Sequence, residues 1–240
     1  MRLDRALVER GWARSRGQAV ELIRAGRVSV DGLVVGKASF EVADDARLAA
    51  DQDHYVSRAA HKLAAALDES ATMVPPRVLD AGASTGGFTQ VCLERGADQV
   101  YAVDVGHGQL APVIRQHPRV VVWEGVNLRR LTLEQVGGQP VGLIVADVSF
   151  ISLTYLVAPL AGVLAPGGIA LLLVKPQFEV GRDRLGPGGL VIDPADQRAA
   201  VEKVAAAGAA VGWRADWRAP SRLPGEHGNQ EFFLRCRSAP

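Results

Sequence analysis

The apolar and polar positions of the N-terminal part of the chain predict two short helices and a hairpin. Apolar residues recur three and four positions apart within residues 3–8 and again within residues 19–23, and a glycine follows each stripe. Residues with that spacing share one helix face, and glycine commonly follows the end of a helix. Residues 28–30 and 33–35 then flank an Asp-Gly dipeptide, which is typical of a tight β-hairpin.

From residue 57 onward, short apolar runs alternate with helical stripes, a pattern typical of an α/β domain with a mostly parallel sheet. The predicted strands cover residues 78–80, 100–104, 120–123, 143–147 and 169–174. A further pair at residues 213–217 and 231–235 flanks a loop rich in proline and glycine, which predicts a closing hairpin with an antiparallel last strand.

The predicted organisation is therefore a small α/β domain at residues 1–56 and a larger α/β domain at residues 57–240. An acidic stretch at residues 44–53 is the expected linker. A length of 240 residues accommodates both domains, since domains usually contain about 50 to 250 residues.

The longest uncharged stretch, residues 148–174, is long enough to resemble a membrane span. Its interior argues against a span, because Pro166, Gly167 and Gly168 form a helix stop followed by a turn. We expect a helix at residues 153–164 and a buried strand at residues 169–174. Runs rich in leucine and valine are typical of central parallel strands, so the membrane interpretation is disfavoured.

Composition narrows the class of protein and its compartment. Hydrophobic residues at 48% and charged residues at 22% are typical of a soluble globular protein. Because the net charge is only +1, any binding of nucleic acid must depend on local clusters of arginine. Cys92 and Cys236 lie far apart and lack metal-ligand spacing, which argues against a disulfide framework and a zinc site. The charged N-terminus lacks the apolar core of a signal peptide, so a cytoplasmic location is expected.

A loop of small residues between the first predicted strand and the next helix is the candidate cofactor site. Gly82 and Gly86 allow a sharp turn and close approach of a ligand, and Ser84 lies between them. Asp80 precedes the loop, and Asp104 ends the next strand, where a carboxylate can accept hydrogen bonds from ribose hydroxyls. The loop does not match the dinucleotide pattern G-x-G-x-x-G. A carboxylate-lined pocket suits the sulfonium of S-adenosylmethionine, and a turn without a ligand is the alternative.

Four charged residues are predicted to meet at one edge of the sheet. Asp147 and Lys175 end neighbouring strands, and Glu231 reaches the same edge if the last strand is antiparallel. Lys62 lies on a predicted helix at residues 57–67 that could cover this edge. Methyl transfer to a hydroxyl needs in-line positioning and removal of a proton, and a lysine can accept that proton or stabilise the oxyanion. Lys175 is the predicted central group, and solvated charges are the alternative for each residue alone.

The sequence around these residues resembles the TlyA family, haemolysin-named proteins that act as ribosomal RNA 2'-O-methyltransferases. The resemblance spans nearly the whole chain and is strongest at residues 57–63, 80–89, 103–106, 147–150, 174–179 and 228–232. It implies a Rossmann-like methyltransferase sheet, S-adenosylmethionine as cofactor and methylation of a cytidine ribose. The family's Lys-Asp-Lys-Glu catalytic set falls on Lys62, Asp147, Lys175 and Glu231. Some members carry terminal extensions, so whether one ribosomal subunit or both is modified is left open.

The N-terminal unit is similar to a small RNA-binding module of a small-subunit ribosomal protein and some pseudouridine synthases. The likeness lies in residues 2–4, 15–16, 26 and 28–32. The first 30 residues hold seven arginines against three acids, an excess suited to phosphate contacts. The predicted RNA contacts are Arg5, Arg14, Arg16, Arg24 and Arg27, and ribosomal RNA within a ribosomal subunit is the implied partner.

Three alternatives remain at this point. A membrane-active haemolysin needs a spanning or amphipathic element, for which the broken run at residues 148–174 is the sole candidate. A non-catalytic RNA-binding protein would keep the fold without methyl transfer. A small-molecule methyltransferase would leave the arginine-rich N-terminal unit without a partner.

Overall fold

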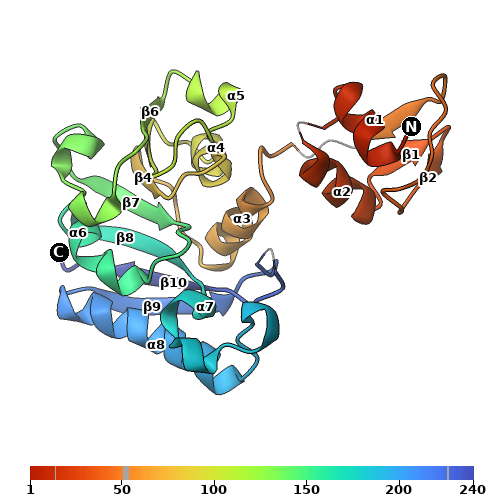
Figure 1. The fold of residues 1–240 in the computed structure, drawn as a ribbon. Helices are drawn as coiled ribbons and strands as arrows, with labels where there is room; N and C mark the ends of the chain where they lie inside the picture. The colour runs from red at the N-terminus through yellow and green to blue at the C-terminus, as the bar shows by residue number, and fades with distance from the viewer. Residues whose placement is uncertain (14, 51–53, 226) are drawn as a thin grey trace. The chain divides into compact units, whose positions relative to one another are not determined.

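The computed structural model describes residues 1–13, 15–50, 54–225 and 227–240. The chain divides into two units, Met1–His54 and Tyr55–Pro240, which are described separately below (Figure 1). Arg14, one of the predicted RNA contacts, lies outside the described residues.

The N-terminal unit contains the two predicted helices and the predicted hairpin. Helices α1 (Leu3–Glu9) and α2 (Arg16–Arg24) precede strands β1 (Val28–Val30), β2 (Leu33–Val34) and β3 (Leu48–Ala50). Asp31 and Gly32 connect β1 to β2 with φ angles of +51° and +83°, the left-handed backbone that a tight hairpin turn requires. The apolar faces of both helices pack on β1 and form the core of this unit.

The acidic stretch predicted as a linker instead contains strand β3. Leu48 pairs with Val30 in an antiparallel ladder, so the order in this sheet is β2-β1-β3. Arg10 reinforces the segment by donating hydrogen bonds to the carbonyl groups of Ala43, Asp44 and Ala46. The linker prediction was wrong here because the apolar residues between the acids complete the core against β1. Residues 51–53 of that stretch lie outside the described residues.

The larger unit is a seven-stranded sheet with helices on both faces (Figure 1). Its strands are β4 (Arg77–Ala81), β5 (Gln99–Val103), β6 (Val120–Trp123), β7 (Val141–Ala146), β8 (Leu164–Val174), β9 (Arg214–Pro220) and β10 (Phe232–Arg237). Its α-helices are α3 (Ala59–Glu69), α4 (Gly87–Glu94), α5 (Pro112–Arg115), α6 (Val157–Ala161), α7 (Pro176–Glu179) and α8 (Pro194–Ala210). Single 3₁₀ turns are η1 (Leu128–Arg130), η2 (Leu133–Val136), η3 (Leu153–Tyr155), η4 (Arg182–Arg184) and η5 (Pro187–Gly189).

The strand order is β6-β5-β4-β7-β8-β10-β9, and strands β4 to β8 are parallel. Strand β10 runs antiparallel to both of its neighbours, β8 and β9. The predicted α/β class with an antiparallel last strand is therefore confirmed. This topology brings the start of β10 to the edge where the parallel strands end.

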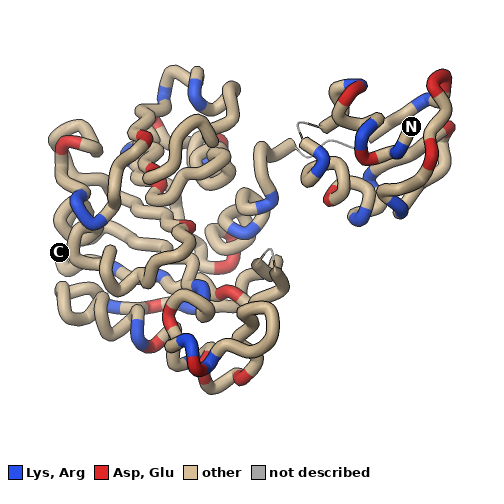
Figure 2. Tube along the Cα trace, in the orientation of Figure 1, with Lys and Arg blue, Asp and Glu red and all other residues tan. Residues whose placement is uncertain are grey.

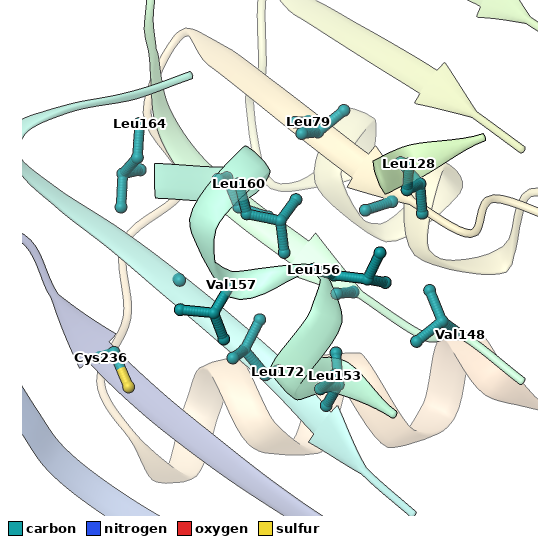
Figure 3. Packing of buried hydrophobic residues seen from close by; sticks show 14 of the residues in the cluster. Leu79, Leu128, Val148, Leu153, Leu156, Val157, Leu160, Leu164, Leu172 and Cys236 are labelled. Carbon is teal, nitrogen blue, oxygen red and sulfur yellow. The ribbon is translucent and has the colours of Figure 1, made fainter. Parts of the chain in front are cut away.

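Two apolar cores cover the two faces of the sheet. Leu143 and Val145 of β7 pack with α3 and α4, whereas Ile144 and Ala146 pack with α6 and α8. This alternation follows from the two-residue period of a strand. Figure 3 shows part of the second core, in which Leu156 and Leu160 from the segment of η3 and α6 are buried together with Leu172 of β8.

The uncharged stretch at residues 148–174 differs in detail from its prediction. The expected helix at residues 153–164 is split into η3 and α6, and β8 already begins at Leu164. The ladder steps from Val141–Leu164 to Leu143–Ile169, so residues 165–168 bulge out between the two pairs. Ser238 from the C-terminal segment supplies hydrogen bonds to Ala165 and Gly168, which explains why this strand starts early. Within the described ranges, no helix has both the length and the hydrophobicity to cross a bilayer.

Candidate active site

The C-terminal edge of the parallel strands gathers the residues nominated from the sequence. Asp80 is the penultimate residue of β4, and Asp104 follows β5 directly. Asp147 follows β7 and Lys175 follows β8. Glu231 precedes β10, whose first residue pairs with the last residue of β8. Residues remote in sequence therefore meet at one edge, as ligand sites of open α/β sheets do.

The loop after β4 is held close to the end of β7. Gly82 has φ +87°, and a Cβ atom there would lie 2.6 Å from the backbone oxygen of Asp147. Glycine is required at this position because a larger residue would meet backbone that cannot move aside. Gly86 has φ +96° and faces Leu110 rather than the strand ends. The two glycines therefore have different roles: Gly82 allows loop and strand to meet, and Gly86 allows the loop to pack on the α5 side.

Asp104 fastens this loop with both carboxylate oxygens. Oδ2 accepts a hydrogen bond from the backbone N–H of Ser84 at 2.8 Å, and Oδ1 accepts one from Gly106 at 2.7 Å. A carboxylate has about four lone-pair sites, so capacity remains for hydroxyl donors of a ligand. A pocket opens beside it and is lined by Ala83, Ser84, Ala102, Asp104, Gly106, Gln109, Leu110, Val122 and Glu124. The lining combines the carboxylates of Asp104 and Glu124 with apolar side chains.

Asp80 is a fully buried carboxylate with an unsatisfied oxygen. Its Oδ2 accepts a hydrogen bond from the Thr89 hydroxyl at 2.6 Å, whereas Oδ1 has no hydrogen-bond partner among the described residues. Burial raises the pKa of Asp80 to about 7, and the nearby carboxylates of Asp147 and Asp104 act in the same direction. A buried acid without a cation is costly. Such a group fits a site that a positively charged ligand completes.

Lys175 and Asp147 form the more open of two lysine-carboxylate pairs at this edge. Lys175 Nζ lies 2.7 Å from Asp147 Oδ1 and donates a hydrogen bond to Ser149 Oγ at 2.8 Å. The contact with Asp147 is an ion pair by distance, although its angle falls outside hydrogen-bond geometry. The two side chains are 12% and 17% exposed, which leaves this pair accessible to a substrate.

Lys62 and Glu231 form the closed pair. Lys62 Nζ donates a hydrogen bond of 2.6 Å to Glu231 Oε2, and the side chains are only 7% and 3% exposed. Asn229 orders the segment before Glu231, because its side chain accepts from the backbone of Val191 and donates to that of Gly189. The structure thus brings the four predicted catalytic residues to one sheet edge as two ion pairs. In the described part of the chain, no cluster of His, Cys, Asp and Glu is arranged to hold a metal ion.

Phe150 is a candidate substrate-binding residue that the sequence did not single out. Its side chain is 92% exposed, its φ is +64°, and its ring centroid lies 5.4 Å from that of Phe178. A positive φ is rare for a bulky residue, and such strain clusters at functional sites. The sequence did not indicate this residue because it lies in an uncharged run, in which apolar residues are expected to be buried. Its place three residues after Asp147 was the available signal.

The predicted RNA contacts of the N-terminal unit have varied environments. Arg5 pairs with Glu9 at 2.9 Å, and Arg16 pairs with the buried Asp4 at 2.8 Å. Hydrogen bonds from Arg2 and then Arg16 lower the pKa of Asp4 to about 2, so Arg16 also stabilises this unit. Arg24 is exposed and Arg27 half-buried. Figure 2 shows basic and acidic positions interleaved along this unit.

Family models match both units of the chain. A model of FtsJ-like methyltransferases matches residues 55–238, and a model of the S4 domain matches residues 1–48. The first match covers most of the larger unit, including the candidate active site.

Similar proteins support the same assignment. The chain is 50% identical over 241 residues to the Mycobacterium tuberculosis protein named 16S/23S rRNA (cytidine-2'-O)-methyltransferase TlyA, covering 99% of this chain and 90% of the relative. A solved structure from Streptococcus thermophilus, described as a haemolysin, has a TM-score of 0.80 and 35% identity, covering 100% of this chain and 88% of that one. An S-adenosylmethionine-dependent methyltransferase from Mesorhizobium loti, at 18% identity and TM-score 0.53, covers 73% of this chain and 97% of its own, and shares the fold.

Proposed function

This chain belongs to the TlyA family of FtsJ-like methyltransferases with an S4 domain, and from that premise we propose that it methylates a cytidine ribose 2'-hydroxyl in ribosomal RNA. The observation that carries the proposal is the Lys175–Asp147 pair, which lies open at the sheet edge beside a carboxylate-lined cofactor loop. A reaction that removes a hydroxyl proton and uses a cationic donor needs both features.

The methyltransferase fold implies S-adenosylmethionine as the cofactor. When bound, this cofactor supplies an electrophilic methyl group on a positively charged sulfur. We propose that Asp104 accepts hydrogen bonds from the ribose hydroxyls of the cofactor. We further propose that the loop around Gly82 and Ser84 packs against the cofactor. Gly86 shapes this loop from the other side. The unsatisfied oxygen of Asp80 and its burial support a role for this residue beside a cationic part of the cofactor.

Lys175 is the proposed catalytic residue that contacts the reacting hydroxyl. As the ribose oxygen gains the methyl group it must lose its proton. Lys175 Nζ carries three protons in its ion pair, so we propose that it passes one of them to the Asp147 carboxylate and takes up the proton of the hydroxyl in its place. Ser149 and Asp147 fix the position of Nζ through contacts of 2.8 Å and 2.7 Å. Lys62 and Glu231 link α3 to the start of β10, which keeps the covering helix next to the reacting groups.

Ribosomal RNA is the proposed partner, and the S4 domain is the proposed first contact. The chemical support is the arginine excess near the N-terminus, where Arg5, Arg16, Arg24 and Arg27 are described and Arg14 is not. Guanidinium groups suit phosphate because they present several donors in one plane. We expect the RNA that this chain modifies to be part of a ribosomal subunit in the cytoplasm.

Labelled methyl transfer tests the proposed function directly. The full chain is incubated with S-adenosylmethionine labelled in its methyl group and with purified small or large ribosomal subunits, and labelled nucleotides are mapped. We expect label on a cytidine 2'-oxygen, its loss in Lys175→Ala and its retention in Glu202→Ala, which removes an exposed carboxylate on α8. Label on a base atom would contradict the assigned chemistry. RNA binding without any label transfer would instead identify a non-catalytic RNA-binding protein.

A membrane-active haemolysin is a second candidate, because a similar solved structure is described as a haemolysin. The same protein preparation can be added to dye-loaded liposomes at the concentrations that support methylation. Dye release by wild-type protein together with absent methyl transfer would favour this candidate. Methyl transfer without release would favour the RNA methyltransferase.

A further inference from the structure

Glu179, at the end of α7, is a buried carboxylate for which the proposed reaction has no use. The residue is 4% exposed, and burial raises the pKa of its carboxyl group. Burying a carboxylate is costly unless strong hydrogen bonds compensate. The partners of this carboxylate therefore indicate why it is there.

Both oxygens of Glu179 accept hydrogen bonds from the start of η3. The Ser152 hydroxyl donates to Oε2 at 2.5 Å, and the backbone N–H of Leu153 donates to Oε1 at 2.7 Å. Lys203 on α8 donates to the backbone oxygen of Glu179 at 2.6 Å and lies 3.8 Å from its carboxylate. The two shortest side-chain contacts thus join α7 to a segment 26 and 27 residues earlier in the chain.

That earlier segment is the one that carries Asp147. It is attached to α7 at two points, because Lys175 contacts Asp147 and Ser149 at one end while Glu179 binds Ser152 and Leu153 at the other. Lys175 is the residue before α7 and Glu179 is its last residue, so one helical turn lies between the two attachment points.

The middle of the segment, between the two attachment points, has an unusual backbone conformation. Phe150 has φ +64°, and its ring centroid lies 5.4 Å from that of Phe178 of α7, with 48° between the ring planes. Backbone strain persists where surrounding contacts over-determine it. Releasing one attachment would let residues 149–151 relax. Ser149 and the side chain of Asp147 would then lose their fixed place beside Lys175, while the backbone N–H of Asp147 stays bound to the carbonyl of Ala81.

We propose that Glu179 is a positioning residue that holds residues 147–153 against α7 and so fixes Asp147 and Ser149 around Lys175. This inference rests on the proposed methyl-transfer function, because it assigns Glu179 a part in that reaction. Glu179 acts through Lys175 and its partners and does not contact the reacting atoms.

Three variants separate positioning from a general contribution to folding. Glu179→Ala removes both hydrogen bonds, Glu179→Gln keeps an oxygen for the Leu153 N–H and lets the Ser152 hydroxyl act as acceptor, and Glu202→Ala is the matched control on α8. Steady-state methylation gives kcat and KM, calorimetry with S-adenosylhomocysteine gives the cofactor Kd, and hydrogen exchange reports the Leu153 amide.

We expect kcat of Glu179→Ala to fall about 10- to 100-fold, since misplacement of a reacting group by about 1 Å can cost that much. Its Kd for S-adenosylhomocysteine should stay within about twofold of wild type, because the residues around Asp104 are untouched, and the Leu153 amide should exchange faster. Glu179→Gln should recover most of kcat, and Glu202→Ala should match wild type throughout.

Two results would overturn the inference. One is an unchanged kcat in Glu179→Ala despite faster exchange at Leu153; the other is a parallel loss of kcat, cofactor affinity and Tm in both Glu179 variants. If Glu179→Ala does not fold, Ser152→Ala removes one hydrogen bond and should lower kcat at unchanged cofactor Kd, with equal kcat rejecting the role. An inactive wild-type chain would reject the proposed function itself, whereas an active wild type with an equally active Glu179→Ala would reject the positioning role alone.

Discussion

The two halves of the active-site edge differ in how their carboxylates are compensated. On the side of β4 and β5, Asp80 and Asp104 have hydrogen-bond donors but no ion pair among the described residues. On the side of β7, β8 and β10, Asp147 and Glu231 each contact a lysine at 2.7 Å or less. The same kind of side chain is therefore left without a cation in one half and given one in the other.

This difference assigns a ligand to each half on electrostatic grounds. An uncompensated carboxylate in a protein attracts a cation and gains from its arrival, as expected for a sulfonium cofactor. RNA carries one negative charge per phosphate, so the half that receives it should not be acidic overall. The lysine-paired half meets that requirement and also holds groups that can move a proton.

Removing the open lysine should have the largest effect on activity. We expect Lys175→Ala to lower kcat for methylation by about 10²- to 10⁴-fold, the usual range for loss of a general acid or base. The Kd for S-adenosylhomocysteine should change little, because the cofactor half keeps its carboxylates. Calorimetry and single-turnover methylation measure the two quantities, and a strong loss of cofactor binding would show that the two halves are not separate.

Breaking the closed pair should affect stability as much as activity. Glu231→Ala leaves the Lys62 ammonium buried without a partner, and we expect this to lower the free energy of unfolding by about 3 to 5 kcal/mol. Asp147→Ala breaks the open pair and should cost less, because solvent and Ser149 still reach Lys175. Chemical denaturation of the full chain compares the two variants.

The double variant Lys62→Met with Glu231→Leu is the control for this prediction. Replacing a buried ion pair by apolar residues of similar size is often neutral for stability, so unfolding should return toward the wild-type value. Methylation should remain low if the pair also places α3 for the reaction. Recovery of activity along with stability would reduce the closed pair to a purely structural element.

Truncating Phe150 tests whether RNA binds at the half of the edge where Asp147 and Glu231 are paired with lysines. An exposed ring beside Lys175 can stack on a nucleobase, an interaction worth about 1 to 3 kcal/mol by alanine substitution. We expect Phe150→Ala to raise KM for the ribosomal subunit by about fivefold or more at unchanged cofactor Kd. Phe150→Tyr, which keeps the ring, should behave like wild type. An equal KM in the alanine variant would exclude a contact between this ring and RNA.

Much of the fold followed from local sequence patterns, because helix and strand periods and the Asp-Gly turn act over a few residues. The strands ending near Asp80, Asp104 and Asp147 were predicted within about two residues, a usual boundary error. Strand β3 and the early start of β8 were missed, since both depend on partners remote in sequence. Leu48 needs Val30, and Leu164 needs Val141 together with hydrogen bonds from the C-terminal segment.

The candidate site could be nominated from strand ends, but its pairing could not. Sequence order places Lys62 near Asp80, yet the structure joins Lys62 to Glu231 across 169 residues. The burial that distinguishes the closed pair from the open one depends on α3 and on the loop before β10. The sequence did not single out Glu179 or Phe150 either, because the contacts that distinguish them come from elements remote in sequence.

The smallest expected effect is a pH dependence of cofactor binding, which arises in the half of the edge where Asp80 and Asp104 have no ion pair. Asp80 has a pKa of about 7, and the groups around it are Asp147 with its partner Lys175, Asp104, Thr89 and Cys92. The protonated acid offers no charge to a cationic cofactor, so affinity for S-adenosylmethionine should rise from pH 6 to pH 8, by at most about tenfold per pH unit. Calorimetry at constant ionic strength measures this slope.

Asp80→Asn should remove that slope and stabilise the protein without cofactor. The pKa of Asp80 is raised in the folded chain, so between pH 4 and pH 7 the folded state binds more protons than the unfolded state and stability falls as pH increases. The asparagine variant carries no such cost and should melt higher than wild type at pH 8 while binding the cofactor more weakly. Asp104→Asn is the control in the same half. Because Asp104 is partly exposed, this variant should keep the pH dependence of cofactor affinity. A wild-type Kd independent of pH would show that the buried carboxylate is compensated in some other way, and the contrast between the two halves would then lose its electrostatic basis.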